Sequence, residues 1–135
     1  MKNLPLCLLA VALNTSAASA DEQLAAPNEL LVGSLGPGKD GFLAGQLDTP
    51  FGVDFDASGN MYIVELDGGR VHKLEPSGRF KTIAGDGSKG YSGDGGPARN
   101  ATFNGMHNVA VTPEGDLYIA DTWNHCVRKI DHATG

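Results

Sequence analysis

The sequence predicts an all-β fold made of repeated antiparallel sheets, and two observations carry that prediction. Residues 52–74 align with residues 108–130 without a gap, at an offset of 56 residues, and six of the 23 aligned positions are identical. Each copy also alternates short apolar runs with polar turns that contain glycine, which is the pattern of β-hairpins. A fixed period of this length indicates one supersecondary unit that is used repeatedly.

The first two strands of each unit are expected to form a hairpin. In the second unit, apolar runs at 109–111 and 117–120 flank a turn in which Pro113 presets φ and Gly115 takes the positive-φ position. A third strand follows a tight turn in both units, and the first unit continues into a fourth strand. The strands expected in the first unit are 51–55, 61–64, 70–75 and 79–84. In the second unit, the innermost strand is expected to begin at 106–108 and to include the apolar run at 109–111, and the next strands are expected at 117–120 and 126–131.

The polarity of these strands predicts how the sheets pack. The first two strands of each unit are apolar on both faces, whereas the third and fourth strands carry Arg, His and Lys. We therefore expect the inner strands to be buried on both faces and the outer strands to face water. A radial stack of four-stranded sheets, a β-propeller, has this arrangement.

The first 20 residues have the pattern of a secretory signal peptide. Lys2 precedes an apolar run at 4–13, interrupted by Pro5, and small residues lead to the A-x-A site at 18–20. We expect the mature chain to begin near Asp21 and to be secreted or periplasmic. The apolar run is shorter than the roughly 20 residues that a membrane span needs, and no later segment is a candidate, so no membrane span is expected.

The charge balance argues against a nucleic-acid partner. The whole chain has a net charge of −6, and loss of residues 1–20, which contain Lys2 and no acid, makes it −7 with no basic cluster. Cys7 leaves with this segment, so Cys126 becomes the only thiol. Its position in an expected strand favours a buried, unreactive role.

Several motifs resemble those of NHL repeat proteins. Residues 117–130, LYIADTWNHCVRKI, are similar to the NHL signature, in which Asn-His follows the second strand, and residues 83–98 resemble the long linker of bacterial NHL proteins. The resemblance covers about residues 30–135 and implies a propeller of the exported bacterial type, commonly with six blades. The first unit departs from the pattern at 65–69, and Cys126 stands where the family usually has a basic residue, so one repeating binding code is not expected.

We therefore expect about two four-stranded blades out of six in the region 30–135. Six glycines within residues 85–96 match neither a phosphate-binding loop nor a calcium loop, which favours a compact crossover between blades. In chain order, the expected segments are a signal peptide at 1–20, a linker at 21–29, an outer strand at 30–33, a blade at 51–84, a glycine-rich crossover at 85–105 and an incomplete blade at 107–131.

Two units are too few to close a ring, because repeat architectures generally need at least three stacked units. The sequence favours a fragment of a longer gene product. The alternative is that three chains assemble six blades, with the strand at 30–33 of one chain completing the last sheet of its neighbour.

Candidate binding residues lie where the first strand of each unit begins and where the second strand gives way to the third. These positions are expected on one face of a propeller, near its central channel. They are Phe51, Glu65, His107, Asn108, Asp121, Trp123, Asn124 and His125. For Asp121, Asn124 and His125, a role in forming the loop is favoured over ligand contact. Trp123 is expected either to anchor a partner or to cover a neighbouring blade.

Two functions follow from these residues. The first is a non-catalytic exported scaffold that binds a protein or small ligand, without a cofactor, through His107, Asn108, Trp123, Asn124 and His125. The alternative is a metal-dependent propeller enzyme, similar to lactonases or to the peptidylglycine amidating lyase, in which Ca²⁺ or Zn²⁺ polarises substrate or water. Its candidate metal ligands are Glu65, His107, Asn108 and Asp121.

Overall fold

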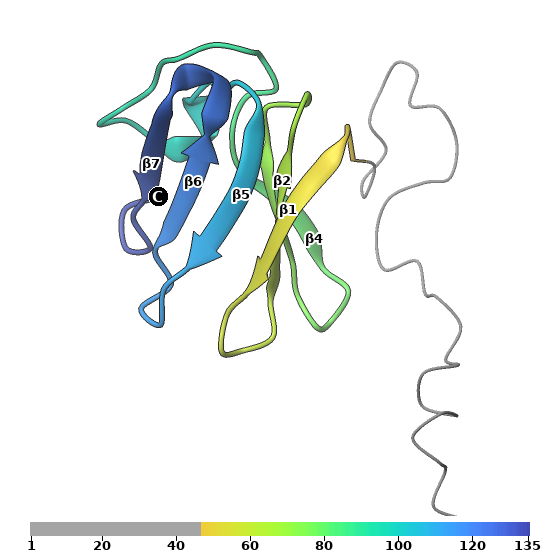
Figure 1. The fold of residues 1–135 in the computed structure, drawn as a ribbon. Coiled ribbons are helices and arrows are strands. Elements are labelled where there is room, and N and C mark those ends of the chain that lie inside the picture. The colour runs from red at the N-terminus through yellow and green to blue at the C-terminus, as the bar shows by residue number, and fades with distance from the viewer. Residues whose placement is uncertain (1–46) are drawn as a thin grey trace, which may run out of the picture. The chain divides into compact units, whose positions relative to one another are not determined.

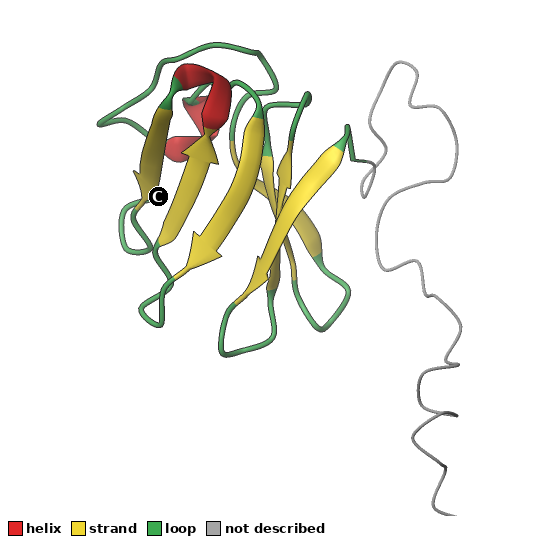
Figure 2. Ribbon diagram, viewed as in Figure 1, coloured by secondary structure: helices red, strands yellow, loops and turns green. Residues whose placement is uncertain are grey.

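The computed structural model describes residues 47–135, so the expected signal peptide, linker and strand at 30–33 lie outside the described residues. The described chain forms two antiparallel sheets, with two short 3-10 helices in the connections (Figure 2). The first sheet contains β1 (Pro50–Phe55), β2 (Met61–Glu65), β3 (Val71–Leu74) and β4 (Phe80–Ala84), and the second contains β5 (Met106–Val111), β6 (Leu117–Asp121) and β7 (Cys126–Ile130). These sheets, called blade 1 and blade 2, confirm the all-β prediction.

The turn between β1 and β2 is stabilised by residues of the segment 56–60, in which the sequence predicts a turn. Asp56 Oδ1 accepts hydrogen bonds from the backbone N–H groups of Ser58 and Asn60, both at 2.9 Å, and Gly59 has a φ of 78°. The Tyr62 hydroxyl donates to Asp56 Oδ2 at 3.1 Å. Burial, followed by this bond to the carboxylate, raises the pKa of Tyr62 to about 12. β2 therefore begins directly after a turn in which the Asp56 carboxylate binds both the backbone of the turn and the Tyr62 hydroxyl.

The two blades share one register, including an irregularity that the sequence did not indicate. A bulge separates Pro50 from Gly52 in blade 1, and the repeat-equivalent bulge separates Met106 from Asn108 in blade 2. β5 begins at Met106, before the bulge, where the innermost strand was expected to begin. Bulges increase local twist and redirect side chains, so both inner strands begin with the same change of direction.

The blades pack face to face, with β1 and β5 side by side (Figure 1). Gly52 makes this approach possible, because a Cβ atom there would lie 2.8 Å from Asn108 Cα and 2.8 Å from the carbonyl oxygen of His107. Asp54 Oδ2 accepts a hydrogen bond of 2.8 Å from the backbone N–H of Val111 across the same junction. The shared core contains Tyr62, Val64, Val71, Ala84, Ala101, Phe103, Met106, Val109, Leu117 and Ile119.

The glycine-rich crossover between β4 and β5 is compact. It contains the 3-10 helix η1 (Ala98–Asn100) and two isolated bridges, which pair Lys89 with Phe103 and Ser92 with Thr102. The sequence expectation included neither η1 nor the second 3-10 helix, η2 (Thr122–Asn124). Neither is long and apolar enough to cross a membrane, and the same holds for every helix within residues 47–135.

The prediction that charged residues on the outer strands face water is wrong at two positions. His72 on β3 and Arg128 on β7 are only 3% and 8% exposed. Both lie beside buried carboxylates, which compensate the cost of removing them from water. Conversely, the apolar residues Phe51, Val53 and Phe55 on the innermost strand of blade 1 are more than half exposed.

Candidate functional site

The predicted site residues lie at one end of the two blades, where the inner strands begin and the second strands end. Pro50 pairs with Glu65 in blade 1, and Met106 pairs with Asp121 in blade 2. We call this end, with the connections from β2 to β3 and from β6 to β7, the loop face. Both blades contribute to it.

Two fully buried carboxylates form the inner layer of the loop face. Glu65 Oε1 accepts a 2.7 Å hydrogen bond from the backbone N–H of Asp48, and Asp121 Oδ1 accepts a 2.7 Å bond from that of Asn104. Donor and acceptor are 17 residues apart in both blades. Each carboxylate therefore ties the segment before an inner strand to the end of the second strand.

Basic side chains on the third strand or directly before it lie beside both carboxylates. In blade 1, His72 Nε2 lies 3.1 Å from Glu65 Oε1, and an Arg70 guanidinium nitrogen lies 3.6 Å from Oε2. In blade 2, an Arg128 guanidinium nitrogen lies 3.6 Å from Asp121 Oδ2. His72 and Arg128 are repeat-equivalent, so each blade encloses its own carboxylate beside a basic side chain.

Arg128 also fastens the crossover to blade 2. It donates to Asp94 Oδ1 at 2.6 and 2.9 Å, to the Thr102 carbonyl at 2.7 Å and to the Ser92 carbonyl at 2.8 Å. Its guanidinium carbon lies 4.5 Å from the ring centre of Phe103. The bonds from Arg128, with one from a tyrosine hydroxyl, hold the pKa of Asp94 below its usual value. The glycine-rich segment is thus part of the blade structure, as the sequence favoured.

Asn124 and His125 shape the connection from β6 to β7. Asn124 Nδ2 donates to Asp121 Oδ2 at 2.9 Å and to the Gly90 carbonyl at 2.7 Å. His125 ends η2 in the left-handed conformation, with a φ of 56°. Asn124 thus holds this connection as a donor, and His125 contributes its backbone conformation. The next residue, Cys126, is half-buried, and burial together with the nearby Asp121 charge raises the pKa of its thiol.

A group of rings, exposed at Phe51 and Trp123 and half-buried at His107, crosses the loop face from one blade to the other. The Phe51 and His107 ring centres are 4.6 Å apart in an edge-to-face arrangement, and those of His107 and Trp123 are 6.3 Å apart. We call these three residues the aromatic strip. His107 Nδ1 lies 2.9 Å from the Gly105 carbonyl oxygen. Because a carbonyl only accepts, the Nδ1–H group donates in this contact.

A charged pair borders the aromatic strip. Lys89 Nζ lies 5.4 Å from the Trp123 ring centre and forms a 2.7 Å ion pair with Asp67. The hydrogen bond from Lys89 is the main cause of a lowered Asp67 pKa. Trp123 itself packs over Gly105, which has a φ of 65° and no room for a side chain. The ring is thus fixed against backbone while remaining 46% exposed.

The sequence did not point to the aromatic strip as a unit. Phe51, His107 and Trp123 are far apart along the chain, and only their placement at equivalent ends of the blades brings them together. Glu65 and Asp121 lie in separate internal clusters, and Asn108 is exposed on β5. No group of three or more His, Cys, Asp or Glu side chains among residues 47–135 is arranged to hold a metal ion. The metal-dependent alternative stays a prediction without a described site.

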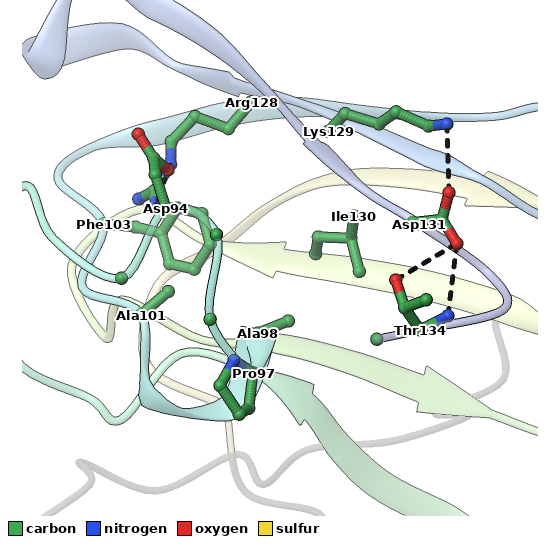
Figure 3. A pocket seen from close by; sticks show the side chains of 14 residues that line it. Asp94, Pro97, Ala98, Ala101, Phe103, Arg128, Lys129, Ile130, Asp131 and Thr134 are labelled. Carbon is green, nitrogen blue, oxygen red and sulfur yellow. Dashed lines mark hydrogen bonds and ion pairs between the residues drawn. The ribbon is translucent and has the colours of Figure 1, made fainter.

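A pocket of roughly 450 Å³ lies beside β7, away from the aromatic strip (Figure 3). Phe103 and Ile130 form its apolar part. Asp94 is bound by Arg128 at one end, and Asp131 interacts with Lys129 and Thr134 at the other. The charged groups that line this pocket are thus paired with each other. The aromatic strip remains the better candidate for contact with a partner.

Adjacent antiparallel sheets with their inner strands side by side are blades of a β-propeller. Residues 43–131 match the family model described as the Teneurin NHL domain. The chain therefore belongs to the NHL repeat family, as the repeat signature at 117–130 implied.

Similar proteins include much longer ones. Teneurin-1 of Mus musculus is 30% identical over 113 residues, which cover 70% of this chain and 4% of that protein. Protein SUPPRESSOR OF QUENCHING 1, chloroplastic, of Arabidopsis thaliana is 33% identical over 86 residues, which cover 63% of this chain and 8% of that protein. A solved structure of a protein of unknown function from Bacteroides thetaiotaomicron has a TM-score of 0.58 and 31% identity, covering 63% of this chain and 22% of that one.

Proposed function

We propose that this chain is an exported propeller module that binds a protein partner through the loop face and does not catalyse a reaction. The observation that carries the proposal is the aromatic strip, which spans both blades and leaves Phe51 and Trp123 about half exposed. Large, rigid aromatic side chains are the groups that most often dominate the energy of protein interfaces. Because the rings of the strip already contact each other, little side-chain conformational entropy is lost when a partner binds.

The polar groups of the loop face support binding more than catalysis. Glu65, Asp121 and Arg128 are buried and direct their bonds to other parts of the chain. Asn124 likewise donates to Asp121 and to Gly90. A catalytic group needs a reacting atom within hydrogen-bond reach. Phe51, Trp123 and the Lys89–Asp67 pair are exposed, as are Asn108 and His125, and this mixture of rings and polar groups suits the apolar centre and polar rim of an interface.

The experiment compares capture of proteins from the exported fraction of the source by four immobilised forms of the chain. We expect a partner that binds the unmodified chain and is lost from Trp123→Ala and Phe51→Ala. Phe55→Ala is the matched control, because Phe55 lies on the same strand with equal exposure but at the opposite end. Removal of a central aromatic anchor typically costs about 2 kcal/mol or more, roughly a 30-fold weaker affinity.

Trp123 supplies a second readout, since it is the only tryptophan in the chain. Adding the purified partner is expected to shift its fluorescence to shorter wavelength as water leaves the ring. A partner that binds all three variants equally well would overturn the proposal. Turnover of a lactone or peptide substrate that is abolished by a chelator would instead favour the enzyme alternative.

The export part of the proposal rests on the leader-like pattern of residues 1–20. We expect the protein recovered from outside the cytoplasm to begin near Asp21. N-terminal sequencing or intact-mass measurement of that material provides the test, and an intact Met1 on the exported chain would contradict it.

A further inference from the structure

A cleft of roughly 330 Å³ is lined by residues of both blades and of the crossover between them. Blade 1 contributes Lys73 on β3 and Lys81 on β4, and the crossover contributes Arg99 in η1. Blade 2 contributes the apolar residues Leu117 and Ile130. The cleft therefore belongs to the junction between the two blades. We call it the basic cleft, after its lysines and its arginine.

The two lysines of the basic cleft lie opposite each other on neighbouring strands. Lys73 and Lys81 are directly paired in the antiparallel register of β3 and β4, so both side chains lie on the same face of the sheet. Like charges in directly opposite positions are destabilising, and an anion bound between them removes the repulsion. Lys73 is also half-buried, which raises the cost of leaving its charge unpaired. This pairing is internal to blade 1, so it does not depend on what packs against the outer sides of the blades.

The ion pairs of the described residues leave the cations of the basic cleft unused. Four other lysine and arginine side chains lie within 3.6 Å of a carboxylate: Arg70, Lys89, Arg128 and Lys129. No ion pair within residues 47–135 includes Lys73, Lys81 or Arg99. Asp131 also lines the cleft, but its carboxylate accepts bonds from Lys129 and from the backbone of the turn that follows it. The cleft therefore carries three positive charges that form no ion pair in the described part of the chain.

The rest of the basic cleft is apolar. Its floor contains Tyr62, Ile83, Leu117 and Ile130, which belong to the core shared by the blades or pack against it. Lys73 Nζ lies 5.5 Å from the centre of the Tyr62 ring, so this ammonium group is held above the floor. An apolar lining with a few convergent charged groups is the usual composition of a small-molecule site. Lysine and arginine bind phosphate oxygens through strong charge-assisted hydrogen bonds.

We propose that the basic cleft binds a small organic phosphate, with its phosphate group held by Lys73, Lys81 and Arg99 and its organic part against the apolar floor. The bound dianion neutralises the repulsion between the two strands of blade 1. Because Arg99 comes from η1, the same ligand also ties the crossover to β4. The cleft shares no residue with the aromatic strip, so this site is independent of the proposed partner binding at the loop face.

Isothermal titration calorimetry at constant ionic strength tests the site, with phenyl phosphate as the ligand and phenol as its neutral counterpart. We expect one phenyl phosphate to bind per chain and phenol to give no heat of binding. Lys81→Met keeps an unbranched side chain but removes the charge, so it should bind phenyl phosphate at least roughly tenfold more weakly. Arg79→Met is the matched control. Arg79 also forms no ion pair within residues 47–135, but it lies in the turn before β4 and does not line the cleft.

Thermal unfolding separates a loss of binding from a loss of folding. Without ligand, Lys81→Met should unfold at a temperature no lower than that of the unmodified chain, because the repulsion from Lys73 is gone. With phenyl phosphate, the unfolding temperature should rise for the unmodified chain and for Arg79→Met but not for Lys81→Met. The proposal is overturned if phenyl phosphate does not bind the unmodified chain, if phenol binds it equally well, or if Lys81→Met binds phenyl phosphate as tightly as Arg79→Met does.

Discussion

At the scale of single residues, the repeated unit is organised around a buried carboxylate and a basic side chain on the third strand. Blade 1 uses Glu65 with His72, and blade 2 uses Asp121 with Arg128. His72 also lies 3.0 Å from the Thr82 hydroxyl on the neighbouring strand, so its second ring nitrogen has a partner as well. In both blades a basic side chain thus lies beside a buried carboxylate, but the side chains differ between the blades. This arrangement explains why charged residues occur on strands that are largely buried.

Arg128 is the residue whose loss should be most damaging. Arg128→Met would leave Asp121 buried without its cation and would free two carbonyl groups from their donor. Breaking a buried ion pair in this way typically costs about 3–5 kcal/mol. Arg128→Lys should cost less, because the charge remains while the planar fork of donors is lost. Urea unfolding followed by circular dichroism measures both losses.

Lys129→Met is the control for these two variants. Lys129 is adjacent to Arg128 but exposed, and its ion pair with Asp116 lies at the surface. Surface pairs of this kind contribute about 0–1 kcal/mol. If Arg128→Met and Lys129→Met lower the free energy of unfolding equally, Arg128 does not hold the crossover in the way described above.

At the scale of elements, the sequence was sufficient wherever the signal is local. Each hairpin depends on alternating apolar residues and on a glycine at a turn position, as in Gly59 and Gly115, which both have positive φ. Both features are present within about ten residues, so the ends of the strands agree with the sequence expectation to within one residue. The bulge at the start of β1 and β5 was missed because no residue there is distinctive of a bulge.

The candidate site was less predictable, because its contacts join distant parts of the chain. Asp94 and Arg128 are 34 residues apart, and the sequence gives no means of pairing them. The sequence does contain one indication of the buried carboxylates. Glu65 and Asp121 are acidic residues at equivalent positions of the repeat, and His72 and Arg128 are basic residues at another pair of equivalent positions. An acid and a base that recur at the same positions of both repeats, on strands that are otherwise apolar, indicate an ion pair inside each blade. This pattern argues against Glu65 and Asp121 as metal ligands.

At the scale of the whole molecule, the two blades behave as one packed body. Phe103 from the crossover lies in the same core as Tyr62 of blade 1 and Ile119 of blade 2, so neither blade buries its apolar face alone. The closest approach of the blades occurs at Gly52, where the backbones of β1 and β5 meet. The stability of both blades should therefore depend on the absence of a side chain at this position.

Gly52→Ala tests that dependence. The added methyl group would lie 2.8 Å from Asn108 Cα and from the His107 carbonyl oxygen, so the backbones must move apart. Overpacking of this kind typically costs about 1–3 kcal/mol. The 2.8 Å hydrogen bond from Val111 N–H to Asp54 spans the same junction, so hydrogen exchange at Val111 should become faster. Gly96→Ala is the control, because the nearest atom to its Cβ would be 3.4 Å away, and there Val111 exchange should not change. Unchanged exchange at Val111 in Gly52→Ala would show that the blades do not depend on this contact.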